Sequence, residues 1–499
     1  MTKRLIVFVH GWSTTHTSTY GGLPKRISAE AARVGVDVSV SEVFLSKYVS
    51  FRDEVRVEDV ATAFEAAVRT ELETLVEAHG QFTAITHSTG APALREWHRR
   101  FYVDKERSGP CPMRHLIMLA PANFGSALAI IGKGRLGRIK SFFQGVEPGT
   151  GVLNWLQLGS ADSWALNEWW ITSGAEHIGG DSGIFPFVIT GQSIDRKLYD
   201  HLNTYTGESG SDGVIRVAAA NLNATYVRLR QHSVAPGEDG ALKARLRESD
   251  PVEAPRTAMR VVAGASHSGK DMGIMRSVDP RPGYRKGQEV ADAIIAAMLV
   301  DTAEDYDALI PAWDAATAEV QEEERLEIED RLLLPDSFFI HDRYSMVIAR
   351  MRDSAGHSVA DFDLLLTGDD HSPDRLPDGF LVDRQWNADA RTLTFLFNND
   401  VMVGSDEPVA RVGREYRAPL PGANRLGMII KPRPDEGFVH YVDSEVAATP
   451  SAVKRFLKPN QTTLVDIELE RVVRRGTYEL DRGFDQRGFK HSDPGDPVE

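Results

Sequence analysis

The first 300 residues alternate between short, largely apolar runs and longer stretches with helical composition. The apolar runs lie at 5–9, 36–45, 82–86, 115–120, 185–190 and 259–263. Apolar runs of this length are typical of strands buried on both faces of a parallel sheet. Between them, residues 60–78 are rich in Ala, Glu and Leu and predict a long helix, and a second helix is expected at 91–102. The alternation predicts βαβ units with right-handed crossovers, and therefore an α/β domain over residues 1–300.

The strand pattern lapses between residues 123 and 183, where aromatic residues gather instead. Four of the eight tryptophans of the chain fall here, with two phenylalanines: Trp155, Trp164, Trp169, Trp170, Phe142 and Phe143. Insertions beyond a sheet commonly form part of a pocket. The segment is therefore expected to be a lid or an acyl-binding wall. For most of the single side chains, ordinary packing of helices against the sheet is the simpler interpretation.

Beyond residue 300 the pattern changes. Residues 301–336 are strongly charged and predict a connecting helix exposed to solvent. Between 337 and 480 apolar and polar residues alternate, as along 392–397 and 463–470, which predicts antiparallel strands and a second domain resembling a β-sandwich. Residues 481–499 are polar and are expected to be disordered.

Composition and charge narrow the classes of protein. The chain has 499 residues, more than the roughly 250 to 300 that one core supports, so two domains are expected. A net charge of −15 argues against non-specific binding to nucleic acid or to anionic membranes. Cys111 is the single cysteine, which excludes an intrachain disulfide and a cysteine-rich metal site. The apolar run after the first residues is too short for a signal peptide, so a cytoplasmic location is expected, with leaderless export left open.

The segment Thr86-His87-Ser88-Thr89-Gly90 joins a predicted strand to a predicted helix. A tight strand-to-helix turn lifts a serine hydroxyl above a sheet when small residues flank it at two positions on either side. Gly90 meets this requirement, and Thr86 stands where glycine is commonest. Ser88 is therefore the predicted nucleophile. His87 is expected to point away from the hydroxyl and to shape the pocket or simply to pack.

A serine nucleophile needs a base within hydrogen-bond reach and a carboxylate that orients this base. Asp212 comes after the run at 185–190, and His267 directly follows the run at 259–263. Both fall beyond the carboxyl end of a predicted strand, where ligand sites of open α/β sheets lie. Asp212 stands in an Asp-Gly pair and can also be read as a turn former. The rivals are Asp195 and Glu208 for the acid, and His201 and His232 for the base.

Acyl transfer also requires donors for the oxygen that becomes negatively charged. Two backbone N–H groups are candidates. One belongs to Thr89, just after the nucleophile at the start of a predicted helix, where the helix dipole favours negative charge. The other belongs to Trp12, which follows His10 and Gly11 at the end of the first predicted strand.

Together, these sequence segments and their order along the chain resemble the lipase branch of the α/β-hydrolase superfamily. The resemblance rests on residues 7–12, on the elbow around Ser88, on 211–215 and on His267, with 119–126 resembling the segment after the next strand. The order Ser, Asp, His is that of the family. The resemblance covers about residues 2–300 and implies an α/β-hydrolase fold and a serine hydrolase with no metal or organic cofactor. Thr86 in place of glycine is a departure that some lipases share.

Three functions follow from this reading. The first is hydrolysis of carboxylic esters, expected to be lipid-like acyl esters, through an acyl-enzyme, with transient contact of the lid with a membrane surface. The second is an acyltransferase that uses the same three residues with an alcohol as acceptor. The third is an inactive hydrolase scaffold whose β-rich domain binds a protein or glycan. The sequence identifies no partner for the β-rich domain.

Overall fold

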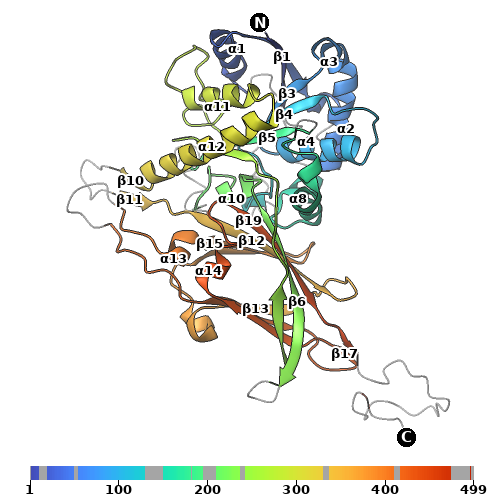
Figure 1. Ribbon diagram of the computed structural model, residues 1–499, viewed down its shortest axis with the longest axis vertical. Coiled ribbons are helices and arrows are strands. Elements are labelled where there is room, and N and C mark those ends of the chain that lie inside the picture. Colours follow the sequence, from blue (N-terminus) through green and yellow to red (C-terminus); the bar gives the residue numbers. More distant parts are fainter. Residues whose placement is uncertain are drawn as a thin grey trace, which may run out of the picture.

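The computed structural model describes residues 2–10, 19–49, 54–129, 150–180, 183–194, 209–236, 242–329, 337–408, 416–473 and 495. The upper part in Figure 1 is built on a six-stranded sheet in the order β2-β1-β3-β4-β5-β9. Every neighbouring pair in it is parallel, which confirms the predicted α/β domain. The strands are β1 (Thr2–His10), β2 (Val36–Phe44), β3 (Phe82–His87), β4 (Met113–Leu119), β5 (Phe185–Thr190) and β9 (Ala258–Val261).

Helices cover both faces of this sheet because its strands are apolar on both. Along β1, Leu5, Val7 and Val9 join one core cluster, and Ile6 and Phe8 join the other. The first cluster includes α2, α4, α7, α8 and α10, and the second includes α1, α11 and much of α12. The helices are α1 (Leu23–Arg33), α2 (Val57–Ala67), α3 (Glu73–His79), α4 (Gly90–His98), α7 (Thr150–Leu156), α8 (Ala161–Ser173), α10 (Val217–Ala220), α11 (Gln288–Met298) and α12 (Ala303–Glu323).

A separate ten-stranded sheet forms the lower part of the molecule in Figure 1. Its main path runs β13-β16-β18-β7-β6-β19-β12-β15-β14, and β8 pairs with β6. The strands are β6 (Thr225–Pro236), β7 (Leu242–Glu248), β8 (Val252–Glu253), β12 (Tyr344–Asp353), β13 (Phe362–Thr367), β14 (Leu381–Asn387), β15 (Thr392–Asn398), β16 (Leu426–Pro432), β18 (Asp443–Ala448) and β19 (Thr462–Leu469). Smaller elements are β10 (Leu326–Glu329), β11 (Ser337–Ile340), α13 (Asn399–Val403), β17 (Val439–His440), α14 (Pro450–Val453) and β20 (Val472–Val473).

The second, β-rich domain is confirmed, and two details differ from the sequence prediction. First, its sheet is mixed, because β19 pairs in parallel with both β12 and β6, and β18 pairs in parallel with β7. Second, β6, β7 and β8 lie within the first 300 residues of the chain and yet belong to this sheet. We therefore use "hydrolase domain" for the parallel sheet with its helices and "β-rich domain" for the ten-stranded sheet, irrespective of position along the chain.

The two domains share a hydrophobic core. Met346 and Ile348 of β12, Leu396 of β15 and Leu464 of β19 join the same buried cluster as α10 of the hydrolase domain. Burial of this kind, at about 25 cal/mol per Å² of apolar surface, stabilises the contact between the domains. The β-rich domain therefore packs firmly on the hydrolase domain.

The charged stretch after residue 300 forms helix α12, but this helix is not exposed to solvent on all sides. Tyr306, Ile310, Trp313 and Val320 are buried, and α12 lies against β9. The spacing of these residues places them on one face, so the acidic residues are left for the outer face. The predicted disordered tail, 481–499, falls outside the described residues except for residue 495.

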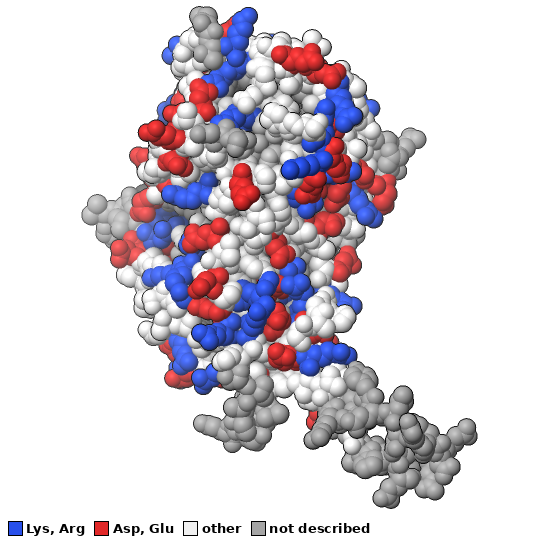
Figure 2. All heavy atoms as spheres, turned by 45° about the vertical axis from the view of Figure 1, so that its right-hand side comes forward, with Lys and Arg blue, Asp and Glu red and all other residues white. Residues whose placement is uncertain are grey.

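Acidic and basic side chains are interspersed over the face shown in Figure 2. On this face neither the acidic nor the basic side chains form one large patch. Among the described residues, no helix is both long and apolar enough to cross a membrane.

Candidate active site

Ser88 lies at a sharp turn between β3 and α4. Its φ is +53°, in the left-handed region that residues other than glycine seldom adopt. The turn is held by the neighbouring strand β4: Ser88 N donates to Leu119 O at 3.1 Å, and Ser88 O accepts from Ala122 N at 3.2 Å. The strained backbone is therefore fixed from outside the turn, as expected for a serine lifted above the sheet.

Gly90 accommodates the threonine at position 86. A Cβ atom at position 90 would lie 1.9 Å from Thr86 Oγ1, far inside contact distance. Both residues are buried, so neither has room to move aside. With threonine at the first flanking position, the second flanking position requires glycine.

His267 follows β9 and contacts both of the other residues predicted for the site. Its Nε2 is 3.2 Å from Ser88 Oγ, and its Nδ1 is 3.0 Å from Asp212 Oδ2. The backbone N–H of His267 also donates to Asp212 O at 2.9 Å. The structure thus brings together Ser88, His267 and Asp212 in one hydrogen-bonded chain.

The carboxylate of Asp212 is fully buried and is oriented by its own loop. Its Oδ1 accepts hydrogen bonds from the backbone N–H groups of Val214 at 3.0 Å and Ile215 at 2.8 Å. The other oxygen, Oδ2, is left to face the imidazole of His267. A carboxylate in this place favours the tautomer with the proton on Nδ1, so that Nε2 can accept the proton of the serine hydroxyl.

His87 supports the loop that carries His267, a role that the sequence did not reveal. Its Nε2–H donates to the carbonyl oxygen of His267 at 3.1 Å, and the two rings lie 4.6 Å apart between centroids. Burial, followed by the proximity of His267, holds the pKa of His87 well below its ordinary value of 6.5. His87 is therefore a neutral donor that fixes the backbone beside the imidazole.

Comparison with solved structures finds a relative that matches the whole chain. Phospholipase PlaB from Legionella pneumophila is 36% identical, with 99% of this chain and 100% of that chain covered and a TM-score of 0.82. A second structure of the same phospholipase, in complex with thio-NAD, is 36% identical over 97% of each chain with a TM-score of 0.80. No protein-family model and no curated protein matches the chain.

The chain belongs to the PlaB phospholipase family. This places it in the lipase, esterase and phospholipase branch of the α/β-hydrolases, and confirms the resemblance drawn from the sequence. The PlaB match spans both domains, whereas the resemblance drawn from the sequence motifs covered only about residues 2–300. As a member of the PlaB family the protein is a carboxylic ester hydrolase.

Of the predicted oxyanion donors, one can be placed in this PlaB-family chain. Thr89 is the N-cap residue of α4 and is 8% exposed. Trp12 lies outside the described residues. So do the rival acids Asp195 and Glu208 and the rival base His201, while His232 lies on β6 of the β-rich domain.

The described part of the aromatic-rich segment 123–183 is well packed. Trp155, Trp164 and Trp170 are each at most 3% exposed, and the guanidinium of Arg350 on β12 lies 4.2 Å from the ring centre of Trp164. All three join the buried cluster on one face of the parallel sheet, as in the simpler interpretation, and Trp164 also contacts the β-rich domain through Arg350. Phe142 and Phe143 lie outside the described residues, and a lid role for the segment stays a prediction.

The ranges that the structure describes contain no candidate metal site. No group of three or more His, Cys, Asp or Glu side chains there could hold a metal ion. Cys111 is partly buried, and desolvation raises the pKa of its thiol to about 12, which favours the neutral thiol at ordinary pH.

Proposed function

We propose that this protein hydrolyses the acyl ester bonds of phospholipids or closely related lipids. Ser88 is the nucleophile, His267 is the base, and the carboxylate of Asp212 orients the imidazole of His267. The observation that carries the proposal is the unbroken series of contacts from Ser88 Oγ through His267 to Asp212, in a chain of the PlaB family. A lipid substrate is supported by the family, since the relative is a phospholipase by name.

The first half of the reaction forms an acyl-enzyme. The hydroxyl oxygen of Ser88 attacks the ester carbonyl carbon while His267 Nε2 takes the hydroxyl proton. The carbonyl oxygen becomes negative and is met by the N–H groups of Thr89 and Trp12. The bond to the alcohol then breaks, and the imidazolium of His267 returns its proton to the leaving oxygen.

The second half releases the acyl group. Water gives a proton to His267 Nε2 and attacks the acyl carbonyl carbon, and the proton then returns to Ser88 as the carboxylic acid departs. The carboxylate of Asp212 faces the imidazolium of His267 and stabilises it in both halves. The ester and one water are thereby converted into one alcohol and one acid.

Hydrolysis of phosphatidylcholine vesicles tests the proposal. The wild-type protein should release fatty acid and lysolipid, and Ser88→Ala should lower the rate by about 10⁶-fold. Ser354→Ala, at an exposed position in the β-rich domain, is the matched control and should keep the wild-type rate. Undiminished release by Ser88→Ala would show that another group performs the reaction.

The same assay separates hydrolase from acyltransferase. With a primary alcohol added, free fatty acid should remain the main product. If the acylated alcohol predominates instead, the acceptor assigned here is wrong although the nucleophile is right.

A further inference from the structure

We infer that the β-rich domain positions Asp212, and that it does so chiefly through an ion pair between Arg216 and Asp383. The inference rests on the proposed function, because it gives both residues a role in keeping Asp212 against His267. Neither residue would touch the substrate. Both act through the loop 209–216, which we call the acid loop.

Hydrogen bonds join the two ends of the acid loop, so a displacement at one end also moves the carboxylate of Asp212. Val217 N donates to Gly210 O at 2.8 Å, and Ser211 pairs with Arg216 in a short antiparallel bridge. The N–H of Ile215 binds the Asp212 carboxylate and directly precedes Arg216. A shift of Arg216 therefore moves one of the two donors that orient Asp212.

Arg216 reaches from the acid loop into the β-rich domain. Its Nη2 donates to Asp383 Oδ2 of β14 at 2.5 Å, and Gln385 Nε2 donates to the same oxygen at 2.9 Å. The side chain of Arg216 is 4% exposed and that of Asp383 is 32% exposed. A guanidinium that is almost fully removed from water is strongly held by a carboxylate beside it. The position of Asp383 thus sets the position of Arg216.

Tyr344, the first residue of β12, packs on the start of the acid loop. A Cβ atom at Gly210 would lie 2.3 Å from Tyr344 Cδ2, so the ring lies directly on the glycine. The Tyr344 hydroxyl also hydrogen-bonds with the side chain of Ser209. Only a small cavity of about 10 Å³ remains among Gly210, Arg216 and Tyr344. The loop therefore cannot move towards the β-rich domain without displacing Tyr344.

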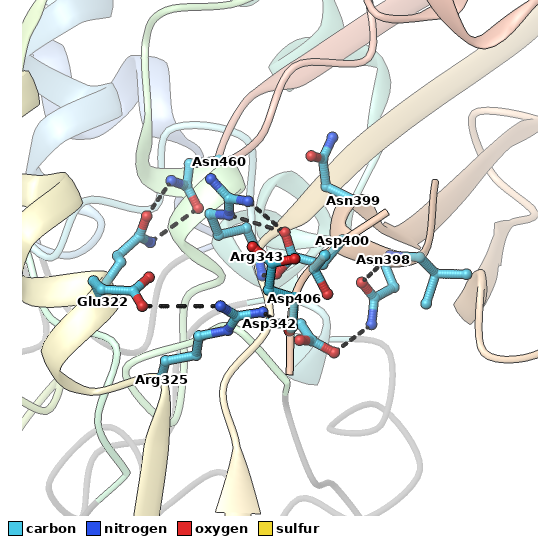
Figure 3. A network of polar contacts seen from close by, with 12 residues as sticks. Glu322, Arg325, Asp342, Arg343, Asn398, Asn399, Asp400, Asp406 and Asn460 are labelled. Carbon is cyan, nitrogen blue, oxygen red and sulfur yellow. Dashed lines mark hydrogen bonds and ion pairs between the residues drawn. The ribbon is translucent and has the colours of Figure 1, made fainter. Parts of the chain in front are cut away.

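The polar network in Figure 3 fixes the start of β12, against which the acid loop packs. Asp342 and Arg343 directly precede Tyr344. Asn398 Nδ2 donates to Asp342 Oδ2 at 2.8 Å, and Arg343 Nε donates to Asp400 Oδ1 at 3.0 Å. Asp342 and Asp400 are both buried. Charge-assisted hydrogen bonds to buried carboxylates are geometrically restrictive, so the strand end that carries Tyr344 is rigid.

The chain beyond the acid loop is held by the same domain. Thr462 Oγ1 at the start of β19 donates to Ala218 O at 2.8 Å, and Asn221 Nδ2 donates to Asn460 O at 2.7 Å. Contacts with the β-rich domain thus occur at the start of the acid loop, at its end and in the residues that follow. The hydrolase domain also holds the acid loop, because Ser126 Oγ donates to Val214 O at 2.8 Å.

Asp383→Asn tests the inference, because it removes the charge and keeps the shape. Active sites are titrated with a fluorophosphonate, and kcat and KM per active site are measured on a soluble p-nitrophenyl ester. We expect kcat to fall about tenfold with KM nearly unchanged, since small displacements of positioned groups cost up to roughly 100-fold.

Two further variants separate positioning from loss of stability. Asp383→Glu keeps the negative charge and should recover most of kcat. Glu168→Gln is the matched control: Glu168 of α8 pairs with Arg350 across the same interface, is 28% exposed and has no part in the acid loop. It should leave kcat per titrated site unchanged. If Asp383→Asn does not fold, Arg216→Lys is measured instead, because it keeps the charge but loses the fork of donors.

Each outcome has a distinct meaning. An active wild-type protein together with an Asp383→Asn variant of unchanged kcat per titrated site would overturn this inference and leave the proposed function standing. A lower melting temperature with unchanged kcat per titrated site would assign the ion pair to stability alone, and would also overturn it. A wild-type protein that neither reacts with the fluorophosphonate nor cleaves the ester would overturn the proposed function, and this inference with it.

Discussion

At the scale of single residues, the turn around Ser88 depends on a pair of side chains that must fit each other. Thr86 occupies a flanking position where glycine would be more usual, and its hydroxyl fills the space that a side chain at position 90 would need. The sequence alone shows each residue to be small enough for the turn. Their mutual dependence is visible only in the structure.

Gly90→Ala is therefore expected to damage the turn. The new methyl would meet Thr86 Oγ1, and overpacking of this kind costs about 1 to 3 kcal/mol of stability. Displacement of Ser88 should lower kcat/KM by about 100-fold. The double variant Thr86→Gly/Gly90→Ala removes the clash and should regain most of the melting temperature and activity. A single variant with wild-type values for both would show that the turn relaxes without cost.

Ser88, Asp212 and His267 could be predicted from the sequence because each follows a recognisable strand and their order is that of a known fold. Arg216 and Asp383 could not, because they are 167 residues apart and follow no spacing rule. The support that His87 gives to the base was not predicted either. The direction of that side chain depends on where the distant loop of His267 arrives, and no local pattern records this.

At the scale of elements, the apolar runs predicted the strands of the parallel sheet, because strands buried on both faces leave an unmistakable composition. The β-rich domain followed from alternation of apolar and polar residues. The same alternation is present at 225–230, where β6 lies, but its position between two strands of the hydrolase domain concealed that it belongs to the other sheet.

The parallel pairs of the second sheet were beyond prediction for a different reason. Turn residues and alternation identify strands and hairpins, and hairpins are antiparallel. β19 lies between β6 and β12, which are distant from it in sequence, and no local signal specifies such a neighbour. In the same way, α12 was correctly expected to be helical, while its packing on β9 depends on tertiary structure.

At the scale of the whole molecule, buried histidines make stability depend on pH. His115 is buried between Thr83 Oγ1 at 2.9 Å and Val300 O at 2.7 Å, and burial lowers its pKa from 6.5 to about 4. Burial likewise lowers the pKa of His98 to about 3. On acidification the unfolded chain takes up protons before the folded protein does. The contribution of these groups is thus complete above pH 6.5 and is lost as the pH falls towards 4.

For His115 the loss amounts to about 3 kcal/mol near pH 4, since one pKa unit corresponds to roughly 1.4 kcal/mol. The melting temperature should therefore fall steeply between pH 7 and pH 4.5. In His115→Gln, which has no titrating group there, the fall should be smaller. His79→Gln, a change at a half-exposed histidine, should follow the wild type. Parallel curves for the wild type and His115→Gln would contradict the pH effect attributed to His115.

The proposed function requires that His267 activates the hydroxyl of Ser88. Mass spectrometry of the intact protein and its peptides after reaction with a fluorophosphonate measures this directly. We expect one phosphonyl group per chain, attached to Ser88, absent from Ser88→Ala and formed far more slowly in His267→Gln. A phosphonyl group on another residue, or a wild-type protein that cleaves lipid esters while Ser88 stays unmodified, would contradict it.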